Sequence, residues 1–73
     1  MEKDEFIKIV GVNIRLLRER KKQSLEDLAI VAGIEYSQLS RIENGKINTT
    51  IYSAFNIANA LGITIGELFA FLG

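Results

Sequence analysis

The side chains that could do chemistry in this chain are mainly cations near its beginning. Six of the nine basic residues fall within positions 8–22, where Glu19 is the only acidic residue, and no Lys or Arg follows Lys46. These six cations are Lys8, Arg15, Arg18, Arg20, Lys21 and Lys22. The formal net charge is zero, but a local basic patch matters more for phosphate binding than the total charge does. The charge distribution therefore predicts a basic side that could bind phosphate groups.

Other kinds of chemistry are excluded by residues that the chain lacks. It contains no His and no Cys, which excludes zinc sites of the usual kind and catalysis by Cys–His or Ser–His pairs. Its nine carboxylates are not clustered for paired acid–base work, and no glycine-rich loop could cradle a phosphate. We therefore expect no enzyme, no metal site and no cofactor.

Length and composition favour one small globular domain over residues 1–73. Apolar residues make up 48% and charged residues 25% of the chain, which is typical of a folded protein. No run of 18 apolar residues exists that could span a membrane, and the acidic start does not resemble a secretion signal. The absence of Cys fits a reducing compartment. We therefore expect a cytoplasmic protein without membrane contact.

Apolar residues recur at three- and four-residue intervals along most of the chain, which predicts an all-α fold of five helices. The expected helices lie at about 5–21, from after Ser24 to Gly33, at about 36–44, at about 50–61, and from after Thr64 through the apolar residues up to Leu72. Ser24 with an aspartate three residues later, and Thr64 with a glutamate at that spacing, fit the capping-box pattern. Asn48 or Thr49 is the expected cap of the fourth helix.

The stretch 24–44 is the most informative, because it predicts two short helices joined by a glycine turn. Gly33 can adopt the left-handed backbone that lets the chain reverse, and Ala29 is small enough for the helices to cross closely. A shared core could form beneath both helices from Leu28, Ala32, Ile34, Leu39 and Ile42. The outer face of the second helix would then be free, and it carries Tyr36, Ser37, Ser40 and Arg41.

An ordered set of motifs covers nearly the whole chain. They are Val10-Gly11, Ile14-Arg15-x-Leu17-Arg18, Ser24-x-x-Asp27-Leu28-Ala29, Ala32-Gly33-Ile34, Ser40-Arg41-Ile42-Glu43-Asn44-Gly45-Lys46, Ala58-x-Ala60-Leu61-Gly62-Ile63 and Glu67-Leu68. With these motifs the sequence resembles the lambda-repressor/Cro-like class of helix-turn-helix proteins, the XRE family. The resemblance implies a five-helix lambda-repressor-like bundle. It also implies sequence-specific binding of double-stranded DNA, with the helix at about 36–44 in the major groove.

The resemblance also assigns expected roles to individual residues. The expected DNA-binding residues are Ser24, Leu25, Tyr36, Ser37, Gln38, Ser40, Arg41, Asn44 and Lys46. Arg41 would be the best base reader, because its guanidinium can bond guanine O6 and N7 together. Backbone N–H groups at the start of the first helix of the motif would bind a phosphate, and Asn44 and Lys46 would contact the next ones. Arg18 and Glu43 match positions that form an ion pair in the family, and losing one partner of a partly buried pair would cost about 3 kcal/mol.

Three functions remain open at this point. The first is a transcriptional repressor or autoregulator that binds paired half-sites as a homodimer. Its dimer interface would use part of the apolar C-terminus with Ile47, Ile51 or Tyr52, although the C-terminus could instead close the core against Phe6. The second is the antitoxin of a toxin–antitoxin pair, with a toxin as partner. The third is a protein-only interaction module, suggested by Leu25 where the family often has Gln, by Glu35 where Ser or Thr is common, and by the zero net charge.

Overall fold

The computed structural model describes all residues, 1–73, and contains helices without any strand. The helices are α1 Lys3–Arg20, α2 Leu25–Ala32, α3 Tyr36–Glu43, α4 Ile51–Leu61, α5 Ile65–Leu68 and a terminal 3₁₀ turn, η1, Ala70–Leu72. The all-α prediction is confirmed. The expected extent of the last helix is wrong, because α5 ends after one turn and the remaining apolar residues continue as a separate 3₁₀ turn.

Short polar side chains begin three of the helices. Both capping boxes form: the Ser24 hydroxyl accepts from the backbone N–H of Asp27 at 3.0 Å, and the Thr64 hydroxyl accepts from that of Glu67 at 3.0 Å. The cap predicted for α4 is wrong. Thr50, not Asn48 or Thr49, accepts from the Ser53 N–H at 3.0 Å, because α4 starts at Ile51 and only the preceding residue reaches that N–H. The Asn48 side chain instead accepts from the backbone N–H of the next residue.

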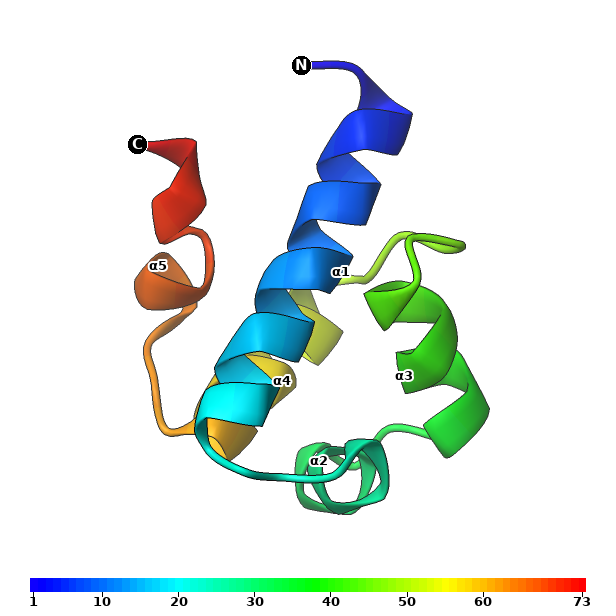
Figure 1. Cartoon of the computed structure of the whole chain (residues 1–73), viewed down its shortest axis with the longest axis vertical. Helices are drawn as coiled ribbons and strands as arrows, with labels where there is room; N and C mark the ends of the chain where they lie inside the picture. Colours follow the sequence, from blue (N-terminus) through cyan, green and yellow to red (C-terminus); the bar gives the residue numbers. More distant parts are fainter.

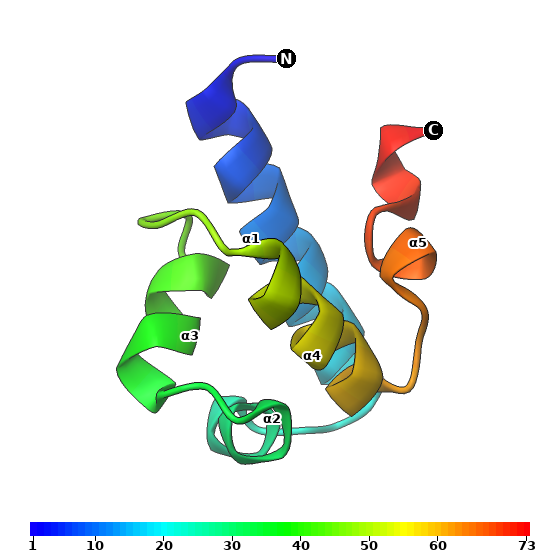
Figure 2. The same ribbon diagram turned by 180° about the vertical axis from the view of Figure 1, so that it is seen from behind.

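The long helix α1 organises the arrangement of the others (Figure 1). It packs against α3 on one side, and the segment α5–η1 runs along its other side, as both views show (Figure 2). α2 lies across one end of the molecule and contacts both α3 and α4. No helix combines the length and the hydropathy that a membrane crossing requires.

One hydrophobic core lies between these helices. Its largest fully buried side chains come from α1, α2, α3, α4 and α5, and they are Ile14, Leu28, Leu39, Ile42, Ile57 and Leu68. Each such side chain stabilises the fold by roughly 1.5–3 kcal/mol. The predicted shared core beneath α2 and α3 is present, with Ala29 and Ala32 buried in it and Ile34 packed at its edge.

Gly11 allows α1 and α3 to approach closely. It is buried in the middle of α1, and a Cβ at this position would lie closer than 3.0 Å to the carbonyl oxygens of Ile42 and Glu43. Those oxygens belong to the backbone and cannot rotate away as a side chain would. The glycine therefore fixes the distance between α1 and the last turn of α3.

The C-terminal segment closes the core against the beginning of α1. The rings of Phe6, Phe69 and Phe71 form a cluster with centroids 6.1–6.4 Å apart. Asn13 on α1 donates a hydrogen bond to the backbone oxygen of Leu68. The aromatic side chains of the C-terminal segment therefore pack against α1, and only part of the apolar surface of this segment remains exposed.

Candidate nucleic-acid interface

The turn between α2 and α3 has the geometry that a helix-turn-helix requires. Gly33 follows α2 with φ of 70°, in the left-handed region, and the Ile34 N–H bonds back to the Ala29 carbonyl at 3.0 Å. This geometry satisfies the last carbonyls of α2 and redirects the chain within three residues. α3 then begins at Tyr36 and packs against both α1 and α2.

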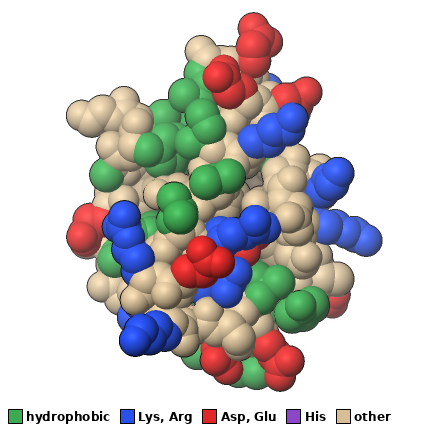
Figure 3. All heavy atoms as spheres, viewed as in Figure 1, with side chains coloured by type: hydrophobic (Ala, Val, Ile, Leu, Met, Phe, Trp, Pro, Cys, Tyr) green, Lys and Arg blue, Asp and Glu red, His purple; other side chains and the backbone are tan.

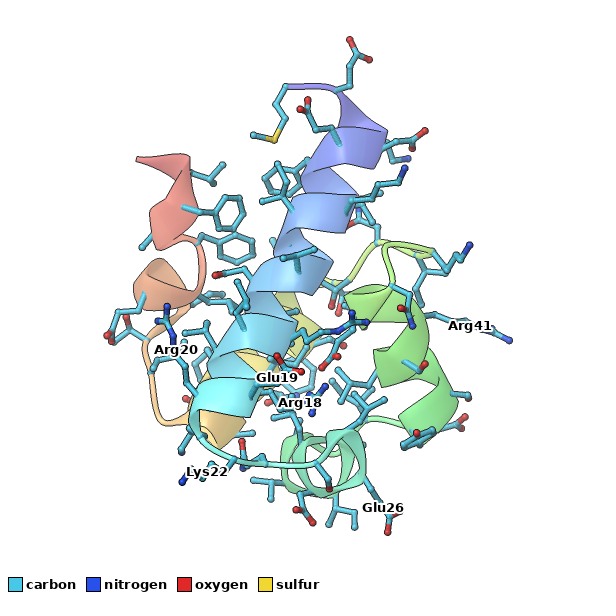
Figure 4. All side chains as sticks on the ribbon, viewed as in Figure 1. Arg18, Glu19, Arg20, Lys22, Glu26 and Arg41 are labelled. Atoms are coloured by element: carbon cyan, nitrogen blue, oxygen red, sulfur yellow. The ribbon has the colours of Figure 1, made fainter.

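α3 has two distinct faces. Leu39, Ile42 and Glu43 are buried against the body of the protein. The opposite face is exposed and carries Tyr36, Ser37, Gln38 and Arg41. Figure 4 shows Arg41 extending away from the molecule, with no other element beyond it. Ser40 is only half-buried, and its carbonyl accepts a hydrogen bond from Asn44. The face expected to be free of packing is therefore exposed at Tyr36, Ser37 and Arg41 but partly covered at Ser40.

The beginnings of α2 and α3 present backbone N–H groups in an acidic setting. The Leu25 side chain is partly buried and packs against the core. Glu26 and Asp27 are exposed in the first turn of α2. Glu35 precedes α3 and makes no side-chain cap. The dipole of each helix favours a bound anion at its N-terminus. The negative charges of these three carboxylates would instead repel a phosphate.

A buried ion-pair network joins α1 to the end of α3. Glu43 is 3% exposed, and Arg18 binds it with two hydrogen bonds, from Nε to Oε2 at 2.7 Å and from Nη2 to Oε1 at 3.0 Å. Arg18 also donates to the carbonyl of Gln23 at 3.0 Å. The hydrogen bond to Glu43 raises the pKa of Arg18, against the opposing effect of burial. The ion pair expected between Arg18 and Glu43 is present, and its geometry holds α3 at a fixed angle to α1.

A second arginine joins the network, and the sequence reasoning did not anticipate its contacts. Arg15 lies 3.4 Å from Glu43 through Nε, and its Nη2 donates to Asn44 Oδ1 at 2.9 Å. The Asn44 amide in turn donates to the Ser40 carbonyl at 2.8 Å. Both the oxygen and the nitrogen of the Asn44 side chain therefore have hydrogen-bond partners within the protein. The available signal was that Arg15 stands three residues before Arg18, on the same face of a helix.

The cations of positions 8–22 do not share one face, so the predicted single basic side is wrong. Arg15 and Arg18 point toward Glu43, whereas Figure 4 shows Arg20 and Lys22 on the side of the molecule away from Arg41. The Lys21 ammonium lies beside Gly62 at the end of α4. Helical periodicity disperses neighbouring residues around α1. In Figure 3 further Lys and Arg side chains lie along the edge formed by α3 and the loop after it.

The comparisons with known proteins agree with this geometry. A helix-turn-helix family model, HTH_3, matches residues 14–68. The chain is 34% identical over 61 residues to the uncharacterized HTH-type transcriptional regulator y4dJ of Sinorhizobium fredii, covering 84% of this chain and 79% of that protein. It is 36% identical over 56 residues to the control protein C.MunI of a Mycoplasma species, covering 77% and 76% of the two chains.

A solved structure supports the same assignment. The restriction-modification controller protein C.AhdI from Aeromonas hydrophila superimposes with a TM-score of 0.83 at 34% identity, over 89% of this chain and 97% of that one. The match thus covers most of the chain. The chain therefore belongs to the helix-turn-helix HTH_3 family, the XRE-like class that its motifs resemble.

Proposed function

We propose that this DNA-binding transcription regulator acts as a repressor or autoregulator by occupying an operator with α3 in the major groove. The observation that carries the proposal is the two-sided character of α3. Its inner face is anchored by Leu39, Ile42 and the Arg18–Glu43 pair, while its outer face is exposed and polar. A helix held in this way can enter a groove without losing any contact that stabilises the fold.

Within this proposal, base reading falls to the exposed face of α3. Arg41 can bond guanine bidentately, and Tyr36 can touch a thymine methyl group or a phosphate. Ser37, Gln38 and Ser40 lie beside them, and Ser40, half-buried, is the least available of the three. The backbone N–H groups at Ser24 and Leu25, together with Lys46, would bind phosphates on either side of the groove.

We also propose that two copies assemble through the outer face of α4. Ile51 is 84% and Tyr52 74% exposed there, and Phe55 and Ile65 are exposed beside them. Of these residues, Ile51 and Ile65 border a hollow of about 240 Å³, which is also lined by Phe6, Val10 and Ala54. A two-fold dimer would cover this surface and present two copies of α3 to half-sites about one helical turn apart.

Selection from random duplexes tests the function, followed by titration of the enriched duplex at several salt concentrations. We expect enrichment of an inverted repeat and a slope of log K against log salt of roughly −4 to −8. Failure to enrich any duplex would favour the protein-only module. A second protein that co-purifies at a fixed ratio and covers α4 would favour the antitoxin.

A further inference from the structure

We propose that Arg15 of α1 binds a DNA phosphate beside α3, and that Asn44 acts as a positioning residue that holds the Arg15 guanidinium for this contact. The inference rests on the proposed function and gives α1 a direct part in it. It also changes the role expected of Asn44, which would act through Arg15 and not bind a phosphate itself.

The ion-pair network of Arg15, Arg18 and Glu43 carries more positive than negative charge. Arg18 already satisfies both carboxylate oxygens of Glu43, at 2.7 and 3.0 Å, while Arg15 meets the same carboxylate only through Nε at 3.4 Å. Two guanidinium groups therefore share one carboxylate, which leaves one positive charge uncompensated. Glu19, one turn further along α1, forms no ion pair with either arginine.

The two arginines of the network differ in their exposure to solvent. The Arg15 side chain is 42% exposed, whereas Arg18 is only 13% exposed. The uncompensated positive charge of the network therefore lies on the solvent-exposed guanidinium of Arg15. A guanidinium carries five N–H donors in a fixed planar arrangement, and only Nε and Nη2 have partners here. Donors remain free for the oxygens of a phosphate.

The Arg15 side chain lies at the end of α3. Asn44 directly follows α3 and links Arg15 to the Ser40 carbonyl, so Arg15 is tied to the last turn of the helix that would enter the groove. Lys8 packs against Gly45, and Lys46 is the next residue. Cations from α1 and from the loop after α3 therefore meet at one edge, next to the exposed face of α3.

The Asn44 side chain already has two hydrogen-bond partners within the protein. Its oxygen accepts from Arg15 at 2.9 Å and its nitrogen donates to Ser40 at 2.8 Å. Both hydrogen bonds restrict the side chain to one orientation, and the first restricts the guanidinium as well. Holding a flexible cation in place before binding reduces the entropy lost when the complex forms.

The test uses the full chain and two probes, a short duplex of mixed sequence and the duplex recovered by selection. Arg15→Gln is compared with Arg20→Gln, which removes the same charge from another side of α1. We expect Arg15→Gln to weaken binding to both probes and to reduce the salt slope by about 0.9, the value for one phosphate contact. Its deficit relative to the unchanged protein should shrink about threefold between ~50 and ~200 mM salt. Arg20→Gln should change the slope far less.

A double-mutant cycle separates the role of Asn44 from that of Arg15. If Asn44 acts through Arg15, Asn44→Ala weakens binding in the original chain but not in the Arg15→Gln background. Arg15→Lys should keep the salt slope, because the charge remains, and should lose most of its sensitivity to Asn44→Ala. Thermal melting of each variant identifies any loss of folding, which is not expected for Arg15→Gln because Arg18 still pairs with Glu43.

Three results would overturn the inference. One is an unchanged salt slope for Arg15→Gln while Lys46→Ala and Arg41→Ala do weaken binding, which would leave the proposed function intact. Another is additive effects of the Arg15 and Asn44 changes, which would make Asn44 an independent contact. The third is an unchanged chain that binds neither duplex in a salt-dependent manner, which would reject the proposed function together with this contact.

Discussion

Arg41 is the residue whose loss should change what the protein recognises and not whether it folds. It is exposed in the last turn of α3 and makes no ion pair within the chain. We expect Arg41→Ala to relax preference at one base position by about 1–3 kcal/mol, because a bidentate contact to guanine would be lost. Selection repeated with the variant measures this preference, and an unchanged preference would mean that another face of α3 reads the bases.

Lys46 provides the matched comparison for Arg41. It is exposed in the loop after α3, where a phosphate contact would carry no sequence information. Lys46→Ala should weaken binding to all duplexes by a similar factor and reduce the salt slope by about 1. Titration of the selected duplex and of a scrambled one distinguishes this outcome from a change in specificity.

Glu43 should dominate the stability of the junction between α1 and α3. Glu43→Ala would leave Arg18, with a side chain only 13% exposed, without its carboxylate, and we expect a loss of about 3 kcal/mol in the free energy of unfolding. For a domain of this size that loss lowers Tm by more than about 10 °C. Glu19→Ala removes an exposed acid of α1 that forms no ion pair, and it should change Tm by little. Equal effects of the two substitutions would show that the ion pair contributes no more than a surface charge.

The roles of single residues were only partly predictable from the sequence. Arg18 and Glu43 could be paired from the motif that contains them. The position of Arg15 three residues before Arg18 indicated that it could also approach Glu43. Its contact with Asn44 was not predictable, because it depends on how α3 ends against α1. The dispersal of Arg20 and Lys22 to another side of the molecule follows from helical geometry once the bounds of α1 are known.

At the scale of elements, the close approach of α1 to α3 depends on Gly11, which has no side chain. Gly11→Ala should destabilise the fold by about 1–3 kcal/mol, since a Cβ there meets two backbone carbonyls at less than 3.0 Å. This loss occurs although alanine favours the helix itself by up to about 1 kcal/mol. The control is Gly66→Ala in α5, where the nearest atom is the Thr64 hydroxyl oxygen at 3.7 Å. Chemical denaturation of both variants should give changes of opposite sign, and a stabilised Gly11→Ala variant would contradict the packing.

At the turn of the helix-turn-helix, a substitution is limited by the backbone conformation of Gly33 and not by steric contact with neighbouring atoms. Gly33 has φ of 70° and nothing within 4 Å of an added Cβ. We expect Gly33→Val to lower the free energy of unfolding by about 1–2 kcal/mol, because β-branched residues are strained in the left-handed region. Gly33→Asn should cost less, since asparagine tolerates this region better. If both variants melted at the same temperature as the original chain, the left-handed conformation at Gly33 would be contradicted.

Element types were easier to predict than element ends. The recurrence of apolar residues at three- and four-residue intervals identified α1 to α4, and two capping boxes located the starts of α2 and α5. The start of α4 was misplaced because Asn48, Thr49 and Thr50 are all acceptable caps in sequence, and packing decides among them. The break between α5 and η1 was missed because Phe69 and Phe71 turn toward Phe6, a contact across more than 60 positions of the chain.

At the scale of the whole molecule, dimer formation and operator binding should fail together. Ile51→Glu would place a charge on the most exposed apolar residue of α4, so we expect a monomer by sedimentation and weak binding to an inverted repeat. Ile30→Glu is the control, because Ile30 is 71% exposed on α2, away from that surface. A variant at Ile51 that stays dimeric, or a monomeric original chain that binds the repeat at full strength, would exclude this interface.

The two chain ends lie near each other, at the end of the molecule opposite α2 (Figure 1). The stacking of Phe6 on Phe69 keeps them there. A fluorophore, an affinity tag or a fused enzyme attached at either end would therefore project away from the turn between α2 and α3. This makes the domain suitable as a module for tethering cargo to DNA, with a linker that need not pass over α3.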